Sequence, residues 1–145
     1  MIKDFTADDF PKCCELFVQV FNNPPWNDKW TNETAYKYLR EVIDHKRFIG
    51  YTLWEKDELT GAVLCRMETH YKGDIIFVEE LFVSMEHQRK GHGAALMGKI
   101  EEYAKENSFV SVSLLTSKGS PPFKFYEKSG YTHLDFLAYM HKRIE

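Results

Sequence analysis

The chain has 145 residues, of which 43% are hydrophobic and 28% charged, and its formal net charge at pH 7 is −3. This length suits one ordinary domain with a packed core, so we expect a single domain that spans residues 1–145. A charge this small gives no sign of a nucleic-acid partner. No apolar run approaches the roughly 20 residues of a membrane-spanning helix, so we expect no membrane partner.

Cysteine usage and the N-terminus indicate the compartment. The three cysteines, two of them the adjacent Cys13 and Cys14, do not form a disulfide framework, which fits a reducing environment. The first residues lack the apolar core of a signal peptide. We therefore expect a soluble cytoplasmic protein. The histidines and cysteines show no metal-ligand spacing, so we expect no metal.

Hydrophobic periodicity predicts a strand, two helices and a loop in the first third of the chain. Residues 1–5 are a strand candidate, and Thr6 is a plausible N-cap for a helix that runs to the Asn-Pro segment at 22–25. A second helix begins near Thr31, with Thr31 and Thr34 as alternative caps. Its predicted apolar stripe consists of Tyr36, Leu39, Val42 and Ile43.

The rest of the chain alternates between strand and helix patterns. The expected strands are residues 48–54, 59–68, 75–83, 109–116, and a final pair at 131–134 and 136–141. The expected helices are residues 91–107 and 123–128. Because no linker, repeat or low-complexity tract interrupts these elements, the pattern indicates one α/β domain.

The stretch from residue 75 to residue 96 organises the chain. An apolar strand leads into the sequence Gln88-x-x-Gly91-x-Gly93, and helical periodicity follows at once. Glycine permits a tight turn and lets a ligand approach the backbone. The free N–H groups at a helix N-terminus attract anions, and Arg89 and Lys90 add positive charge. The turn therefore predicts an anion site for which a diphosphate is a natural ligand.

Two motifs in this order resemble those of the GNAT superfamily of N-acetyltransferases. Gln88-x-x-Gly91-x-Gly93 is similar to the family's Q/R-x-x-G-x-G/A motif, and residues 125–131 are similar to its F-Y-E-K-x-G-F/Y segment. Some features also resemble aminoglycoside N-acetyltransferases. The resemblance, which covers about residues 48–143, implies an α/β (α+β) fold. That fold has a mixed, mostly antiparallel sheet, splayed between strands four and five and flanked by about four helices.

The resemblance also implies a binding site for acetyl-CoA. Pantetheine would enter the splay and contact the backbone of the fourth strand, and the diphosphate would lie on the turn. The implied cofactor-binding residues are Leu81, Phe82, Val83, Gln88, Arg89, Lys90, Gly91, His92, Gly93 and Ala94. The chain departs from the family at Gly119, where many members carry an asparagine that contacts pantetheine. Ser117 or Ser120 could replace that contact.

Two adjacent glutamates in the fourth strand are candidates for the base that deprotonates an amine. Neighbouring strand residues point to opposite faces, so only one of Glu79 and Glu80 should face the acceptor unless a bulge intervenes. We favour Glu79, which matches an acidic position of some aminoglycoside acetyltransferases and shares a face with Leu81. Glu80 is the alternative. Either carboxylate could instead pair with a neighbouring arginine or lysine.

Tyr126 matches the tyrosine that many GNAT enzymes use as a general acid toward the departing thiolate. A thiol with a pKa of ~8.5 is a stronger acid than tyrosine with ~10, so full proton transfer is uphill by roughly 2 kcal/mol. Tyr126 could therefore act by hydrogen bonding to the sulfur. No cysteine is well placed as a nucleophile, which favours direct transfer in a ternary complex.

The loop before the second helix is the candidate acceptor site. Trp26, Asp28 and Trp30 would supply aromatic and acidic surface, which suits a small cationic molecule with a primary amine. A peptide or protein amine is an alternative acceptor. Another alternative is a non-catalytic acyl-CoA-binding domain. The aromatic residues at 131–139 could also support a homodimer.

Overall fold

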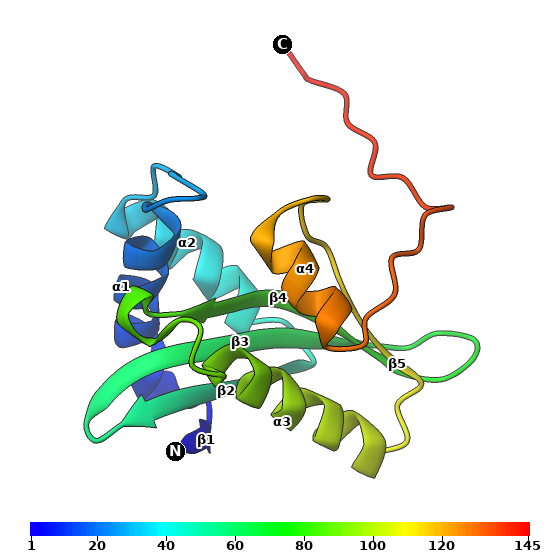
Figure 1. Ribbon diagram of the computed structural model, residues 1–145, viewed down its shortest axis with the longest axis horizontal. Helices are drawn as coiled ribbons and strands as arrows, with labels where there is room; N and C mark the ends of the chain where they lie inside the picture. Colours follow the sequence, from blue (N-terminus) through cyan, green and yellow to red (C-terminus); the bar gives the residue numbers. More distant parts are fainter. The chain divides into compact units, whose positions relative to one another are not determined.

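The computed structural model describes residues 1–145, and none of its helices is both long and apolar enough to cross a membrane. The chain forms two compact units, Met1–Leu115 and Thr116–Glu145. The first unit is built on one five-stranded sheet, which carries helices on both of its faces (Figure 1).

The sheet has the strand order β1-β2-β3-β4-β5, and only the β4–β5 pair is parallel. Its strands are β1 (Ile2–Asp4), β2 (Phe48–Glu55), β3 (Glu58–Glu68), β4 (Ile75–Val83) and β5 (Ser111–Leu114). β5 pairs with β4 only as far as Val78, which lies opposite Leu114, so residues 79–83 of β4 continue without it. The predicted mixed sheet and its splay between strands four and five are thus confirmed.

Three helices of the first unit cover the sheet. The helical elements of the chain are η1 (Ala7–Asp9), α1 (Phe10–Phe21), α2 (Asn32–Ile43), η2 (Met85–His87), α3 (His92–Glu106) and α4 (Pro121–Lys128). In Figure 1, α1 and α2 lie on one face of the sheet and α3 lies on the other. The predicted set of four α-helices is confirmed.

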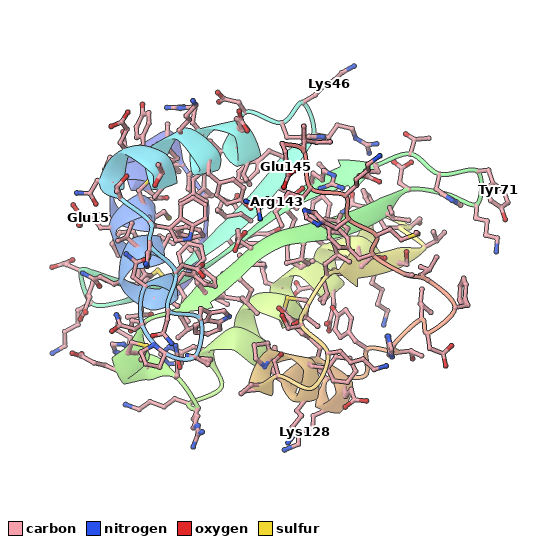
Figure 2. All side chains as sticks on the ribbon, turned by 90° about the horizontal axis from the view of Figure 1, so that it is seen from above. Glu15, Lys46, Tyr71, Lys128, Arg143 and Glu145 are labelled. Atoms are coloured by element: carbon pink, nitrogen blue, oxygen red, sulfur yellow. The ribbon has the colours of Figure 1, made fainter.

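Large apolar side chains hold α1 and α2 against the sheet. Phe17 of α1, Leu39 of α2 and Phe82 of β4 are buried in one cluster. The rings of Phe17 and Phe82 meet edge to face with their centroids 5.6 Å apart. Burial of a side chain of this size contributes about 1.5–3 kcal/mol. Glu15 points outward from α1, and the labelled side chain in Figure 2 marks this polar outer face.

α3 is held close to the end of β4. Its buried side chains include Leu96, Met97 and Ile100. A Cβ at Gly61 of β3 would come within 3.1 Å of the Leu96 side chain, so glycine is what permits this approach. Gly61 lies opposite Val83, the last residue of β4. The packing therefore fixes the strand-to-helix turn at both of its ends.

Two threonines cap α2 jointly. The Thr31 hydroxyl accepts a hydrogen bond of 3.0 Å from the Thr34 N–H, and the Thr34 hydroxyl accepts one of 2.9 Å from the Thr31 N–H. The residues that we predicted as alternative caps therefore act together. The predicted stripe of this helix is wrong at Tyr36, which is 51% exposed, because Ala35 makes the buried contact instead.

The second unit differs from the prediction at two places. α4 begins at Pro121 rather than at residue 123, because the Ser120 hydroxyl caps the helix and prolines suit its first turn. The predicted strands at 131–134 and 136–141 are wrong, since neither segment pairs with any strand. Aromatic composition favours a strand, but a strand also needs a partner for its backbone groups.

Candidate active site

A β-bulge lies at the two adjacent glutamates of β4. Glu80 lies opposite Leu64 and Val78 lies opposite Cys65, so Glu79 is an extra residue without a partner on β3. A bulge of this kind interrupts the alternation of side chains along a strand. We expected only one of Glu79 and Glu80 to face the acceptor unless a bulge intervened, and the structure contains such a bulge.

The bulge brings both carboxylates to the face of the sheet that carries α1 and α2. Cross-strand partners share a face, and Leu64, opposite Glu80, belongs to the core beneath these helices. Glu79 forms an ion pair with Arg66, whose position two residues after Leu64 puts it on the same face. The prediction that Glu79 shares a face with Leu81 is wrong, because the bulge shifts the alternation between them.

Arg66 engages the Glu79 carboxylate. The same guanidinium lies 2.5 Å from Glu68 and stacks over the Phe77 ring at 4.3 Å. Side chains of Arg66 and Glu79 are only 27% and 23% exposed, so their attraction is weakly screened by water. Glu79 thus has the arginine partner that we considered as the alternative to a catalytic role.

Glu80 has a different environment. Its carboxylate accepts a 2.6 Å hydrogen bond from the Tyr38 hydroxyl of α2. Burial raises the pKa of Glu80 to about 7, with a further rise from the charge of Asp28, although the Tyr38 hydrogen bond opposes both effects. Burial also raises the pKa of Tyr38 well above its usual range, so Tyr38 remains a hydrogen-bond donor. Glu80 is therefore a carboxyl group that can exchange a proton near neutral pH.

The loop between α1 and α2 supplies aromatic and acidic groups around Glu80. Trp30 stacks on Tyr38 with ring centroids 5.3 Å apart, and its indole N–H donates a 3.1 Å hydrogen bond to Asp28. Trp26 lies against Phe21, at 5.1 Å between centroids, and is 36% exposed. The structure thus brings Asp28 and Trp30 together with Glu80. No three His, Cys, Asp or Glu side chains form a group that could hold a metal ion.

Three residues of this site were not predicted from the sequence. Tyr38 contacts Glu80, Arg66 contacts Glu79, and Asn22 exchanges hydrogen bonds of 2.8 and 2.9 Å with the backbone of Trp30. Asn22 looked like an ordinary loop residue, and Tyr38 lies outside the expected stripe of its helix. The one available signal was the adjacency of Glu79 and Glu80 in an apolar strand, since carboxylates shielded from water need partners.

The predicted cofactor strand presents its backbone rather than its side chains. Residues 79–83 of β4 have no strand partner on the β5 side. Phe82 is buried in the α1–α2 core, so its side chain is not available to a ligand. The Val83 carbonyl accepts a 3.0 Å hydrogen bond from the Gln88 side chain, which ties the end of β4 to the turn that follows.

The turn from Gln88 to Gly91 has the geometry of an anion site. Gly91 has φ of 83°, and a Cβ placed there would meet no atom within 4 Å. The helix bonds begin with the Ala95 N–H, which donates to the Gly91 carbonyl at 2.9 Å. The N–H groups of His92, Gly93 and Ala94 therefore have no carbonyl partner within α3. Arg89 and Lys90 are exposed and pair with no carboxylate.

In the second unit, Tyr126 lies on α4 between two other aromatic rings. Its ring centroid is 5.0 Å from that of Phe125 and 5.7 Å from that of Tyr131. Gly119, the position where the resemblance led us to expect an asparagine, has φ of 78°. Asparagine tolerates this left-handed conformation better than most residues, so both types suit the turn. The Ser120 hydroxyl is already used, because it donates to the Ser117 carbonyl at 2.6 Å.

The chain belongs to the acetyltransferase (GNAT) family, whose model matches residues 9–131. Streptothricin acetyltransferase A from Bacillus subtilis (strain 168) is 30% identical over 124 residues, which cover 74% of this chain and 69% of that protein.

Solved structures share the fold at lower identity. A possible acetyltransferase from Clostridium difficile 630 has a TM-score of 0.84 at 15% identity, covering 100% of this chain and 98% of its own. The aminoglycoside acetyltransferase meta-AAC0020, from an uncultured soil metagenomic sample and in complex with sisomicin, has a TM-score of 0.76 at 17% identity, covering 100% and 96%. The predicted membership of the family and the similarity to aminoglycoside acetyltransferases are confirmed.

Proposed function

We propose that the protein transfers an acetyl group from acetyl-CoA to a primary amine of a small cationic molecule, by direct transfer in a ternary complex. The observation that carries this proposal is the environment of the Glu80 carboxylate, which accepts a hydrogen bond from Tyr38 and whose pKa is raised to about 7 by burial. A covalent route through cysteine is disfavoured. Cys13, Cys14 and Cys65 are all buried, and burial raises the pKa of each thiol.

The proposed role of Glu80 is to take the proton of the acceptor amine. An alkylamine with a pKa near 10.4 is neutral in about one molecule in 2500 at pH 7, which amounts to roughly 4–5 kcal/mol. A base with a pKa close to the working pH is best suited to remove that proton. Asp28 adds a second negative charge beside Glu80, which favours a cationic acceptor over a neutral one.

Glu79 has a supporting role in this proposal. Its ion pair with Arg66 neutralises the carboxylate and holds the bulged segment of β4 against β3. An arginine partner favours the ionised carboxylate but leaves it poorly disposed to accept a proton. We therefore assign Glu80, the alternative in our sequence analysis, as the acceptor-side base, and Glu79 as a residue that shapes the strand.

The residues of the splay and the turn fit acetyl-CoA, which would supply the thioester when bound. The free N–H groups at the start of α3, with Arg89 and Lys90, would bind its diphosphate. The backbone N–H of Leu81, on the unpaired edge of β4, would stabilise the negative charge that develops on the carbonyl oxygen. Tyr126 would hydrogen-bond to the departing sulfur, in line with its place in the second family motif.

The acceptor class follows from the aromatic and acidic surface around Glu80. Stacked rings such as Trp30 and Tyr38 offer flat apolar faces, and Asp28 and Glu80 offer charge for ammonium groups. The relatives support this class, since one is named for streptothricin and another is an aminoglycoside acetyltransferase in complex with sisomicin. An amino sugar or a polyamine satisfies the same chemistry.

A panel of amines tests the proposal. Thiol release from acetyl-CoA is measured with aminoglycosides, streptothricin, polyamines and short peptides as acceptors. We expect turnover with at least one small polycationic amine. We also expect Glu80→Gln to lower kcat/KM by roughly 10²- to 10⁴-fold and Glu79→Gln to lower it by less than about tenfold.

The other outcomes of the panel point to the alternatives. Preferential acetylation of peptides would replace the small-molecule acceptor with a peptide or protein amine. Tight binding of acetyl-CoA without turnover of any amine would support a non-catalytic acyl-CoA-binding domain. A larger loss of kcat/KM in Glu79→Gln than in Glu80→Gln would reverse the assigned roles.

A further inference from the structure

One carboxylate at the end of β2 contacts two histidines that flank the Gln88–Gly91 turn. The Glu55 carboxylate lies 3.1 Å from Nε2 of His87 and 3.4 Å from Nε2 of His92. The two imidazole rings stack with their centroids 5.4 Å apart and their planes at 23°. His87 ends η2 and His92 begins α3, so the two contacts enclose the turn.

The hydrogen-bond pattern gives Glu55 a specific part in this cluster. A carboxylate only accepts hydrogen bonds, so His87 donates its Nε2–H to Glu55, and His92 Nε2 lies at ion-pair distance from the other oxygen of the same carboxylate. The other ring nitrogen of His87 lies 2.5 Å from the Ser84 hydroxyl, which leaves this ring bonded on both sides. Nδ1 of His92 is buried without a hydrogen-bond partner, so Glu55 supplies the polar contact of that ring.

The turn between the histidines contains a costly backbone conformation. Arg89 has φ of 63° and Gly91 has φ of 83°, both in the left-handed region. This conformation is unfavourable for a residue with a side chain, such as Arg89, because its Cβ comes too close to the following carbonyl oxygen. Such a turn keeps one geometry only where its surroundings hold it in place. The Glu55 contacts on either side of the turn provide that restraint.

We propose that Glu55 is a positioning residue for the diphosphate of acetyl-CoA, acting through His87 and His92 on the turn that binds it. This inference rests on the proposed function. Glu55 has two opposite effects on the affinity for the diphosphate, because its negative charge repels the ligand while its contacts restrain the turn. Removal of the charge alone would tighten binding of an anion. Loss of the restraint would weaken it, and we expect this second effect to dominate.

Calorimetric titration with acetyl-CoA tests the inference in wild type, Glu55→Gln and Asp57→Asn. A glutamine at position 55 has one acceptor oxygen, so it can hold only one of the two histidines. Asp57 is exposed in the β2–β3 turn, two residues after Glu55, and Asp57→Asn removes one negative charge without affecting a contact to a histidine. We expect Glu55→Gln to raise the Kd for acetyl-CoA about tenfold and Asp57→Asn to leave it unchanged or slightly lower.

A second ligand separates positioning from general damage. S-acetyl-pantetheine lacks the diphosphate, so its affinity, measured by protein-observed NMR titration, should be the same in wild type and Glu55→Gln. An unchanged or lower Kd for acetyl-CoA in Glu55→Gln, or an equal loss for both ligands, would overturn the inference. Should Glu55→Gln fail to fold, His87→Gln is titrated with the same two ligands, and we expect the same rise in the Kd for acetyl-CoA and no change for S-acetyl-pantetheine. Absence of acetyl-CoA binding by wild type would overturn the proposed function itself, and the inference with it.

Discussion

The hydroxyl of Tyr38 in α2 donates a 2.6 Å hydrogen bond to the carboxylate of Glu80 at the bulge in β4. This bond links a helix of the α1–α2 layer to the strand that carries the candidate base. It also bears on chemistry, because a hydrogen bond from a neutral donor favours the ionised carboxylate and so lowers its pKa.

Tyr38→Phe should move the pH dependence of the reaction upward. The active form of Glu80 is the carboxylate, so kcat/KM should rise with pH through an apparent pKa of about 7 in wild type and then level. Without the Tyr38 hydroxyl the pKa of Glu80 rises, and the midpoint of this limb should move to higher pH. The measurement is kcat/KM between pH 5.5 and 9.

Asp28→Asn should shift the same limb in the opposite direction. The charge of Asp28 raises the pKa of Glu80, so its removal should lower the midpoint. Comparison of Tyr38→Phe with Asp28→Asn distinguishes a change in the pKa of Glu80 from general damage, since damage to the loop or to α2 would not move the midpoint of the kcat/KM profile in opposite directions. Coincident profiles for wild type and both variants would remove Glu80 as the group that titrates.

The difference in free energy of unfolding between Glu80→Gln and wild type should shift in favour of the variant as the pH rises. The pKa of Glu80 in the folded state, about 7, lies above the ordinary glutamate value of 4.5. The folded state therefore binds more protons than the unfolded state between these values, and wild type loses stability as pH rises through this window. The advantage of the variant should grow by an amount on the order of 1–3 kcal/mol between pH 4.5 and pH 8.

Urea unfolding of both proteins at pH 4.5 and pH 8 measures this difference. Glu15→Gln, exposed on the outer face of α1, controls for the loss of one negative charge. A constant difference between Glu80→Gln and wild type at the two pH values would show that Glu80 does not titrate in this window.

Tyr126→Phe should lower turnover more than it lowers cofactor affinity. The ring, packed between Phe125 and Tyr131, is retained in phenylalanine, and only the hydroxyl is lost. A hydroxyl that stabilises the departing thiolate contributes in the transition state but not to binding. The expected result is a fall in kcat with little change in the Kd for acetyl-CoA. Unchanged kcat would remove Tyr126 from the mechanism.

The sequence predicted most helices and strands well because hydrophobic residues keep a single periodicity along each of these elements. β4 and α3 followed the hydrophobic alternation of a strand and then of a helix, and the turn between them carried its own glycines. The bulge at Glu79 was allowed for but could not be located, since it is set by the pairing of β4 with β3. Tyr38 was missed for a similar reason, because its partner Glu80 lies far away in the sequence.

The predicted strands near the C-terminus were wrong because the sequence does not show whether a segment has a partner strand. Phe136, Leu137 and Tyr139 have the composition of a strand, yet their side chains are exposed and their backbone joins no sheet. Composition reports how well a residue suits a pleated surface, and it does not report whether a neighbouring edge is present.

The central claim is tested most directly by calorimetric titration of acetyl-CoA into wild type, Gly91→Glu and Gly98→Glu. A glutamate at position 91 places strain and negative charge in the turn, whose backbone has φ of 83°. Gly98 lies within α3, the helix that follows the turn. A Cβ at Gly98 also meets no atom within 4 Å, so Gly98→Glu is the matched control. We predict micromolar binding to wild type and Gly98→Glu and none to folded Gly91→Glu. Absence of binding to wild type, or equal binding to all three proteins, would contradict the account.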